Sequence, residues 1–317
     1  MSFALEPRRR AGALLAKVAN SQAGEHSLGH WLLLGLTLIG ISSAASADAI
    51  DDYMQAQLAR YNTPGLALGI VKNGEIVRTQ GYGFANLEHS APMRADSVFQ
   101  SASTGKMFTA VAAMLLVEDG KLRLDESIRT YLPDAPAAWQ PITLRLMLNH
   151  ISGLDRNLDA AEPRTDYTTE QLLQLYYQTQ LKYAPAERFL YSNIGYELVG
   201  LVVEKVSGER SYVDLLKKRV FDPLGMTSAR AIDLRAVIAH RAAGYQPGPG
   251  GELLNQEFES ESLSAQGSSG LYLSAQDYAR WEVGVRNRKI LSEASWQEIF
   301  RPATLASGRS YPYGFGW

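Results

Sequence analysis

The apolar positions of residues 107–117 lie on every side of a helix rather than along one stripe. This pattern predicts a helix over residues 104–119 that is buried on all faces, with Gly120 as its C-terminal cap. Lys106 lies at the start of this helix. Because an unpaired ammonium is costly in buried surroundings, we expect Lys106 to have a functional reason to be there.

Two strand-like runs, residues 66–71 and 75–79, flank Asn73 and Gly74. An Asn-Gly pair between two such runs is the strongest short signal for a β-hairpin, so we expect an antiparallel pair of strands here.

The later periodic segments are helical, and two of them begin with capping pairs, Thr168 with Gln171 and Ser274 with Asp277. The expected helices are residues 50–61, 143–149, 168–178, 194–206, 212–220, 274–281 and 292–300. A hairpin followed by a long block of helices predicts an α+β fold, with an antiparallel sheet subdomain and a helical subdomain. The sheet needs more strands than the pattern reveals.

Residues 31–41 form a short apolar run, which is preceded by scattered positive charge and followed by Ala45, Ser46 and Ala47. This order is typical of a secretory signal, so we expect cleavage near Ala47, a globular domain over residues 48–317 and a periplasmic or secreted protein. The run is short for a transmembrane helix, so a firm membrane anchor is not expected, and an uncleaved signal anchor is the alternative.

The composition narrows the possible partners. The chain has 317 residues, 46% of them hydrophobic, and a formal net charge of −2. This size supports a single packed core, and the acidic balance argues against nucleic acid or anionic lipid as the partner. The chain has no cysteine, its five histidines show no paired spacing and no phosphate-binding loop occurs. No metal and no cofactor are therefore expected.

The candidate chemistry begins at Ser103, three residues before Lys106. On a helix these two positions share one face, so the lysine nitrogen can reach the serine oxygen. A serine hydroxyl must lose its proton to attack. An amine whose pKa is lowered by burial and by the helix N-terminus can accept that proton without a histidine.

A second group of polar residues lies at positions 191–193, just before an expected helix. Tyr191 and Asn193 are also compatible with a core ring and a helix cap. Together with Ser103 and Lys106, however, the phenol can pass a proton to a leaving group, and the amide can hold the lysine and a substrate carbonyl.

These motifs resemble those of the serine β-lactamase and penicillin-binding-protein superfamily, and in particular its class C-like branch, which has Ser-x-x-Lys and Tyr-x-Asn. The resemblance covers about residues 50–317 and includes further segments in the family's order. These segments are residues 99–103, 115–131, 146–154, 187–193, 223–226, 270–279 and 313–317.

The resemblance implies a β-lactamase/transpeptidase-like fold and a serine hydrolase that forms an acyl-enzyme on Ser103. It also implies that Lys106 and Tyr191 share the acid and base work, that Asn193 binds substrate, and that the Ser103 backbone N–H is one oxyanion donor. The implied substrate is a small molecule or short peptide: a D-amino acid peptide, a β-lactam or a small ester.

The family's third motif, Lys-Thr-Gly or His-x-Gly, follows the segment that matches residues 313–317. No such motif occurs in this sequence, and Ser307, Gly308 and Arg309 are the nearest candidate. We therefore expect a fragment or a truncated product that lacks the closing strands and the C-terminal helix.

Two other functions fit parts of the pattern. Residues 101–105 are one substitution from Gly-x-Ser-x-Gly, so an α/β-hydrolase with His150 or His240 as the base is one alternative. The other is a non-catalytic family member that binds peptidoglycan or a protein through the same cleft.

Overall fold

The computed structural model describes residues 49–257 and 259–317. The expected signal region, residues 1–47, lies outside the described residues. Residues 49–61 are helical, as the sequence predicts. Every strand and helix named below belongs to the compact unit Gln57–Trp317. Among the described residues, we find no helix of the length and apolar character that a membrane span requires.

The predicted hairpin is confirmed. Strands β1 (Gly65–Lys72) and β2 (Glu75–Asn86) pair antiparallel, from Gly65 opposite Gly83 to Lys72 opposite Glu75. Asn73 and Gly74 both have positive φ angles, as the two-residue turn requires. Strand β3 (Ala91–Pro92) pairs with β2, so β1 lies at the edge of this sheet.

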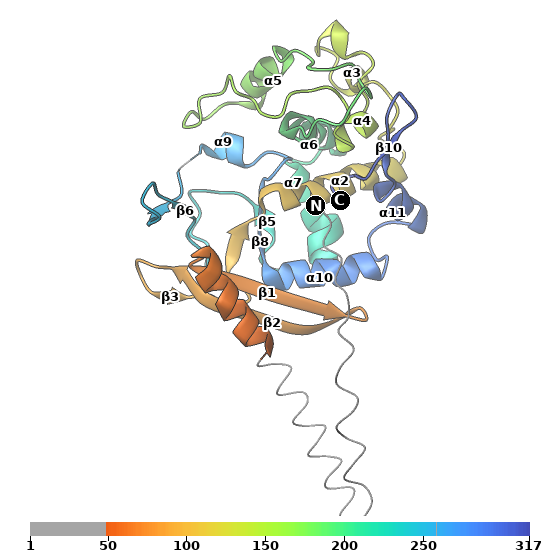
Figure 1. The fold of residues 1–317 in the computed structure, drawn as a ribbon. Coiled ribbons are helices and arrows are strands. Elements are labelled where there is room, and N and C mark those ends of the chain that lie inside the picture. The colour runs from red at the N-terminus through yellow and green to blue at the C-terminus, as the bar shows by residue number, and fades with distance from the viewer. Residues whose placement is uncertain (1–48, 258) are drawn as a thin grey trace, which may run out of the picture. The chain divides into compact units, whose positions relative to one another are not determined.

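Helix α10 (Ala275–Arg286) packs on the face of the hairpin (Figure 1). Its capping box of Ser274 and Asp277 is formed, and the helix extends one turn beyond the predicted end. Gly69 of β1 permits the close approach, since a Cβ there would lie 3.2 Å from the Ala279 Cβ. The first layer of the unit is therefore a sheet covered by one helix.

A second small sheet was not predicted. It contains β4 (Val98–Gln100), β8 (Leu271–Ser274) and β5 (Arg230–Ala231), with β8 in the centre. All four residues of β8 are buried. This sheet matters for the site because β4 leads directly into the segment that carries Ser103.

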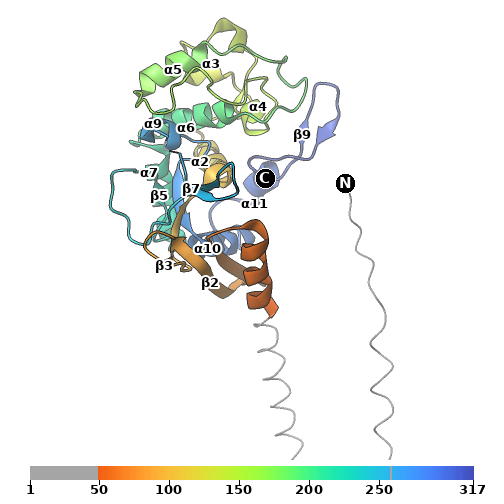
Figure 2. The ribbon, with the colours of Figure 1, turned by 60° about the vertical axis from the view of Figure 1, so that its left-hand side comes forward.

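Helix α2 (Gly105–Glu118) is the buried helix that the sequence predicts. Both views show it between helices α6 (Asn193–Ser207) and α10 (Figures 1 and 2). The Phe108 ring of α2 lies 4.5 Å from the Trp281 ring of α10 and 5.7 Å from the Phe221 ring. Helix α2 is thus the centre of the main hydrophobic core.

The other helices confirm most of the predicted segments. Around α6 lie α3 (Ile128–Tyr131), α4 (Leu144–Leu148) and α5 (Thr169–Tyr177), the last with the predicted capping box. Gly208 ends α6 in the left-handed conformation. The predicted segment 212–220 divides into α7 (Tyr212–Leu216) and a π-helical turn (Lys217–Phe221), and the short helix α8 (Asp222–Leu224) follows. Helix α11 (Glu293–Ile299) follows Ser292 as predicted.

The remaining elements are short. They are the pair β6 (Tyr245–Pro247) and β7 (Leu253–Asn255), helix α9 (Glu261–Ser264), and the pair β9 (Ala303–Thr304) and β10 (Ser310–Tyr311). The α+β class and the division into sheet and helical parts agree with the sequence prediction.

Candidate active site

Ser103 lies in a single 3₁₀ turn (Ala102–Thr104) between β4 and α2. The Ser101 backbone N–H donates to the Leu271 carbonyl of β8 at 2.8 Å, which fixes the turn to the sheet. Ala102 has a φ of +44°, a conformation that a residue with a Cβ rarely adopts. Ser103 itself is exposed. The fold therefore presents this serine at the positive end of a buried helix.

Lys106 is 1% exposed, and its ammonium donates to Asn193 Oδ1 at 2.8 Å and to the Ser268 carbonyl at 2.9 Å. Burial lowers the pKa of Lys106 to about 8, with a further lowering by Arg156, while Glu197 acts in the opposite direction. An appreciable fraction of the amine is thus neutral near pH 8 and can accept a proton.

The sequence predicts contact between Lys106 and Ser103, but among the described residues the Lys106 hydrogen bonds go to Asn193 and Ser268 instead. A buried ammonium needs acceptors, and these two oxygens supply them. Ser103 remains on the solvent side, three residues earlier on the chain.

Tyr191 and Asn193 come together with Lys106. The Lys106 nitrogen lies 4.9 Å from the centre of the Tyr191 ring. Asn193 begins α6, its backbone N–H donates to the Arg156 carbonyl and its side-chain amide donates to Asn157 Oδ1 at 2.9 Å. The structure therefore gathers Lys106, Tyr191 and Asn193, with Asn193 held from three directions.

Ser192 is the N-cap of α6 and anchors the segment between Tyr191 and Asn193. It is fully buried, and its hydroxyl accepts from the Gly195 N–H and donates to the Asp155 carbonyl at 2.6 Å. This anchoring leaves Tyr191 and Asn193 little freedom to move.

His150 supports the same segment from behind. It is fully buried, and Nδ1 accepts a hydrogen bond from the Ser192 backbone N–H at 3.0 Å. Nε2 therefore carries the proton and donates to the Tyr313 hydroxyl at 3.1 Å. Burial, helped by the charge of Lys106, lowers the pKa of His150 to about 3. A neutral ring with both nitrogens engaged fits a structural role.

The alternative triad with a histidine base finds no support in this geometry. Both His150 nitrogens are hydrogen-bonded to other groups, and His240 Nδ1 lies 3.1 Å from Asp96. Among the described residues, neither histidine has a hydrogen bond to Ser103.

One part of the site was missed by sequence reasoning. Three consecutive carbonyls accept hydrogen bonds from side chains at or near the start of α2: Gly267 from Thr109 at 2.6 Å, Ser268 from Lys106, and Ser269 from Ser101 at 2.8 Å. Backbone acceptors have no side-chain signature, so a motif search cannot find them. The only signal is the run of small residues at 267–270, which lets the segment lie close to α2 and α6.

Glu197 was also missed, although it lies one helical turn after Asn193. Ser268 Oγ donates to Glu197 Oε1 at 2.9 Å. Burial raises the pKa of this carboxyl, and Ser268, Tyr176 and the charge of Lys106 counteract the rise.

Two adjoining cavities lie near the serine. One, of about 260 Å³, is lined by Ser103 and Asn193 together with Ser268 and Ser269. The other, of about 550 Å³, does not include Ser103 but shares part of its wall with the first. The shared residues are Gln100, Ala102, Glu259 and Ser264. Lys106 is buried and lines neither cavity, while Tyr191 is half-buried.

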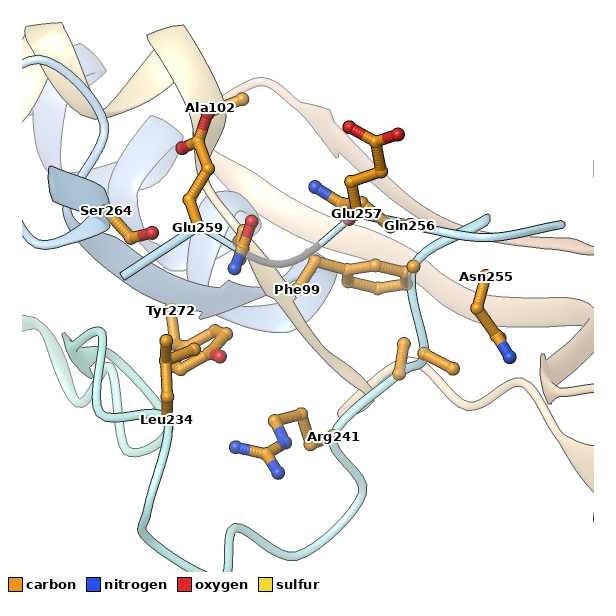
Figure 3. Close-up of a pocket in the computed structure, with 14 residues that line it drawn as sticks. Phe99, Ala102, Leu234, Arg241, Asn255, Gln256, Glu257, Glu259, Ser264 and Tyr272 are labelled. Atoms are coloured by element: carbon orange, nitrogen blue, oxygen red, sulfur yellow. The ribbon is translucent and has the colours of Figure 1, made fainter. Parts of the chain in front are cut away.

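The larger cavity carries charges of both signs. Figure 3 shows the Glu257 and Glu259 side chains at one side of it, Arg241 at the opposite side and the Phe99 ring between them. Among the described residues, neither glutamate has an ion-pair partner. The cavity therefore offers free carboxylates, a guanidinium and an apolar surface next to the serine.

Ser307, Gly308 and Arg309, the nearest candidate for a third motif, form the turn between β9 and β10. They are exposed and line neither cavity. Among the described residues no group of acidic and histidine side chains is arranged to hold a metal ion.

Comparison with known proteins shows which proteins this chain resembles. Penicillin-binding protein 4* of Bacillus subtilis is 30% identical over 268 residues, which cover 78% of this chain and 57% of that protein. The chain thus spans little more than half of this curated relative.

Solved structures show the same fold. D-amino acid amidase from Ochrobactrum anthropi, solved with L-phenylalanine amide, is 27% identical with a TM-score of 0.74, over 85% of this chain and 79% of that one. The octameric penicillin-binding protein homologue from Pyrococcus abyssi is 26% identical with a TM-score of 0.72, over 85% and 64%.

These likenesses establish the β-lactamase/transpeptidase-like α+β fold that the sequence predicts. The family model described as Beta-lactamase matches residues 50–317. The chain therefore belongs to the beta-lactamase family.

Proposed function

We propose that this chain is a serine hydrolase that forms an acyl-enzyme on Ser103. The observation that carries the proposal is the buried amine of Lys106, held by Asn193 and Ser268 three residues after an exposed serine at a cavity wall. A lysine of lowered pKa one helical turn from a serine can activate the hydroxyl without a histidine.

The proposed reaction has two stages. Lys106 accepts the hydroxyl proton while Ser103 Oγ bonds to the substrate carbonyl carbon, and the carbonyl electrons move to its oxygen. The Ser103 backbone N–H, at the helix N-terminus, stabilises that oxyanion. Collapse breaks the bond to the leaving group, which takes a proton through Tyr191. Water then hydrolyses the ester, and Ser103 regains its proton.

We propose an amide, β-lactam or ester of small size as the substrate, such as a D-amino acid peptide. The charges of the larger cavity support a peptide-like substrate, because Arg241 can pair with a carboxylate and Glu259 with an ammonium. The named relatives, a penicillin-binding protein and a D-amino acid amidase, support the same substrate class.

The experiment is intact-mass spectrometry of the full chain after incubation with a fluorescent penicillin and, separately, with a fluorophosphonate. Ser103→Ala is the control. An adduct on the wild type that is absent from Ser103→Ala is the expected result.

The second candidate is a non-catalytic binding module for peptidoglycan or protein. It is favoured by one observation: Ser307, Gly308 and Arg309, the nearest third-motif candidate, line neither cavity. Folded wild-type protein that gives no adduct with either probe would support this candidate and refute the hydrolase.

We also propose export of the chain, with cleavage near Ala47, on the sequence pattern of residues 31–47. N-terminal sequencing of protein from the periplasm or the medium tests this. An intact N-terminus in the membrane fraction would favour a signal anchor.

A further inference from the structure

Glu197 is an acidic group close to the proposed base that the mechanism above does not use. It lies on α6, four residues after Asn193, so both side chains project from one face of the helix. The Glu197 carboxylate accepts from Ser268 Oγ at 2.9 Å, and the Tyr176 hydroxyl of α5 helps to lower the pKa of the carboxyl against the effect of burial. The hydrogen bond from Ser268 fixes the position of the carboxylate.

Ser268 joins this carboxylate to Lys106. The Ser268 carbonyl accepts from the Lys106 nitrogen at 2.9 Å, while the hydroxyl of the same residue donates to Glu197. The Lys106 ammonium and the Glu197 carboxylate are therefore both hydrogen-bonded to Ser268, one to its carbonyl and the other to its hydroxyl. A change in the Glu197 side chain can reach Lys106 both through its electric field and through the placement of Ser268.

The surroundings of the two groups contain few other charges. Around Lys106 are the Arg156 guanidinium, the neutral His150 ring and the faces of Tyr191 and Tyr196. Around Glu197, besides Lys106, are the neutral Ser268 and Tyr176 and the carboxylate of Glu259. Arg156 favours the neutral amine, and Glu197 is the acidic group that favours the ammonium.

We propose that Glu197, acting through Ser268, is a positioning residue that sets the pH range over which Lys106 can accept the proton of Ser103. This inference rests on the proposed function, since it concerns the same base. Its physical content is that a negative charge near Lys106 stabilises the ammonium, which is the form that cannot act as a base.

The sign of the effect follows directly. Acylation rises with pH as Lys106 loses its proton, and the Glu197 charge moves that rise to higher pH. Glu197→Gln keeps the size of the side chain and an acceptor for Ser268 but removes the charge. The rise should then move to lower pH by about 0.5 to 1 unit, so the variant should react about 3- to 10-fold faster than wild type at pH 6.

The test is the second-order rate of fluorophosphonate labelling of the full chain between pH 5.5 and 9.5. Four proteins are compared: wild type, Glu197→Gln, Glu197→Asp and Ser268→Ala. Glu197→Asp keeps the charge and should keep the wild-type midpoint. Ser268→Ala keeps the backbone carbonyl but loses the hydroxyl, so its midpoint should move in the same direction as in Glu197→Gln, by a smaller amount.

A Glu197→Gln profile that is lower at all pH values with an unchanged midpoint would mean a merely structural role and would overturn the proposal. A midpoint that moves to higher pH would overturn it as well. If Glu197→Gln does not fold, Ser268→Ala decides, and an unchanged midpoint in that variant rejects the inference.

A separate measurement distinguishes failure of this inference from failure of the proposed function. The Lys106 side chain can be titrated by NMR of lysine-labelled protein, with its signal assigned through Lys106→Arg. If the wild type is not labelled by the probe, the hydrolase proposal fails. The NMR midpoints of wild type and Glu197→Gln then still show whether Glu197 controls the protonation of Lys106.

Discussion

The buried ring of His150 should make the stability of the fold depend on pH. Its Nδ1 accepts the Ser192 N–H, and only the neutral ring can do so. The pKa of His150 falls from 6.5 to about 3 in the folded chain, with burial as the main cause. The unfolded chain therefore takes up a proton at mildly acidic pH that the folded chain does not.

The size and sign follow from this difference. A histidine with a lowered pKa in the folded state contributes stability that is complete above pH 6.5 and is lost as the pH falls towards 3. A pH of 5 lies about 1.5 units below the pKa of the histidine in the unfolded chain, and protonation of the unfolded state there lowers the stability by roughly 2 kcal/mol.

The assay is urea unfolding, followed by tryptophan fluorescence, at pH 7.5 and pH 5.0 for wild type and His150→Asn. Asparagine tolerates the φ of +58° at this position, and its amide oxygen can accept the Ser192 N–H. At pH 7.5 the variant should be about 1 to 2 kcal/mol less stable, because it loses the hydrogen bond to Tyr313 and part of the ring packing.

The decisive quantity is the difference between the two pH dependences, because other titrating groups contribute equally to both proteins. The wild type should lose about 2 kcal/mol more than His150→Asn between pH 7.5 and pH 5.0. Equal losses in the two proteins would refute the assignment of a neutral, hydrogen-bonded His150.

Further predictions concern the candidate site. Lys106→Ala should slow fluorophosphonate labelling by at least about 100-fold, and Lys106→Arg should not restore it because a guanidinium stays charged; wild-type rates in either variant would contradict a lysine base. Asn193→Ala removes one acceptor of the Lys106 ammonium and should slow labelling by at least about 10-fold, as measured against Asn157→Ala, which loses only the outer hydrogen bond. Gly267→Ala would place a Cβ 2.5 Å from the Tyr196 carbonyl, so it should cost about 1 to 3 kcal/mol in urea unfolding and also impair labelling; full labelling would show that the segment can shift without harm.

The sequence predicts the local elements well where two nearby residues determine the backbone conformation. Asn73 and Gly74 determine the hairpin, and the capping boxes at Thr168 and Ser274 mark two helix starts that the structure confirms. These signals act over three or four residues, so they do not depend on the rest of the chain.

The sheet of β4, β8 and β5 could not be predicted in the same way. Its strands have two to four residues, and β4 pairs with β8 across more than 170 positions of sequence, from Val98 to Ser274. Such short strands lack a readable alternation of polar and apolar residues, and their pairing depends on the tertiary fold.

In the candidate site, too, the local motifs could be predicted and the contacts between distant segments could not. Ser103, Lys106, Tyr191 and Asn193 carry reactive side chains at recognisable spacings, and the structure brings the last three together. The Ser268 carbonyl accepts a hydrogen bond from Lys106. Such a contact can be predicted only if the loop that passes α2 is known. Whether these residues catalyse a reaction stays a prediction.

The two oxygen acceptors of Lys106 have a consequence for how its nitrogen is oriented. A neutral amine has two hydrogens and one lone pair in a tetrahedral arrangement, and Asn193 Oδ1 and the Ser268 carbonyl can take both hydrogens. Because the bond to Cε takes a third direction, the lone pair occupies the single direction that remains, and a proton can enter or leave there while both hydrogen bonds persist. The nitrogen can therefore alternate between its two protonation states without rotation of the side chain.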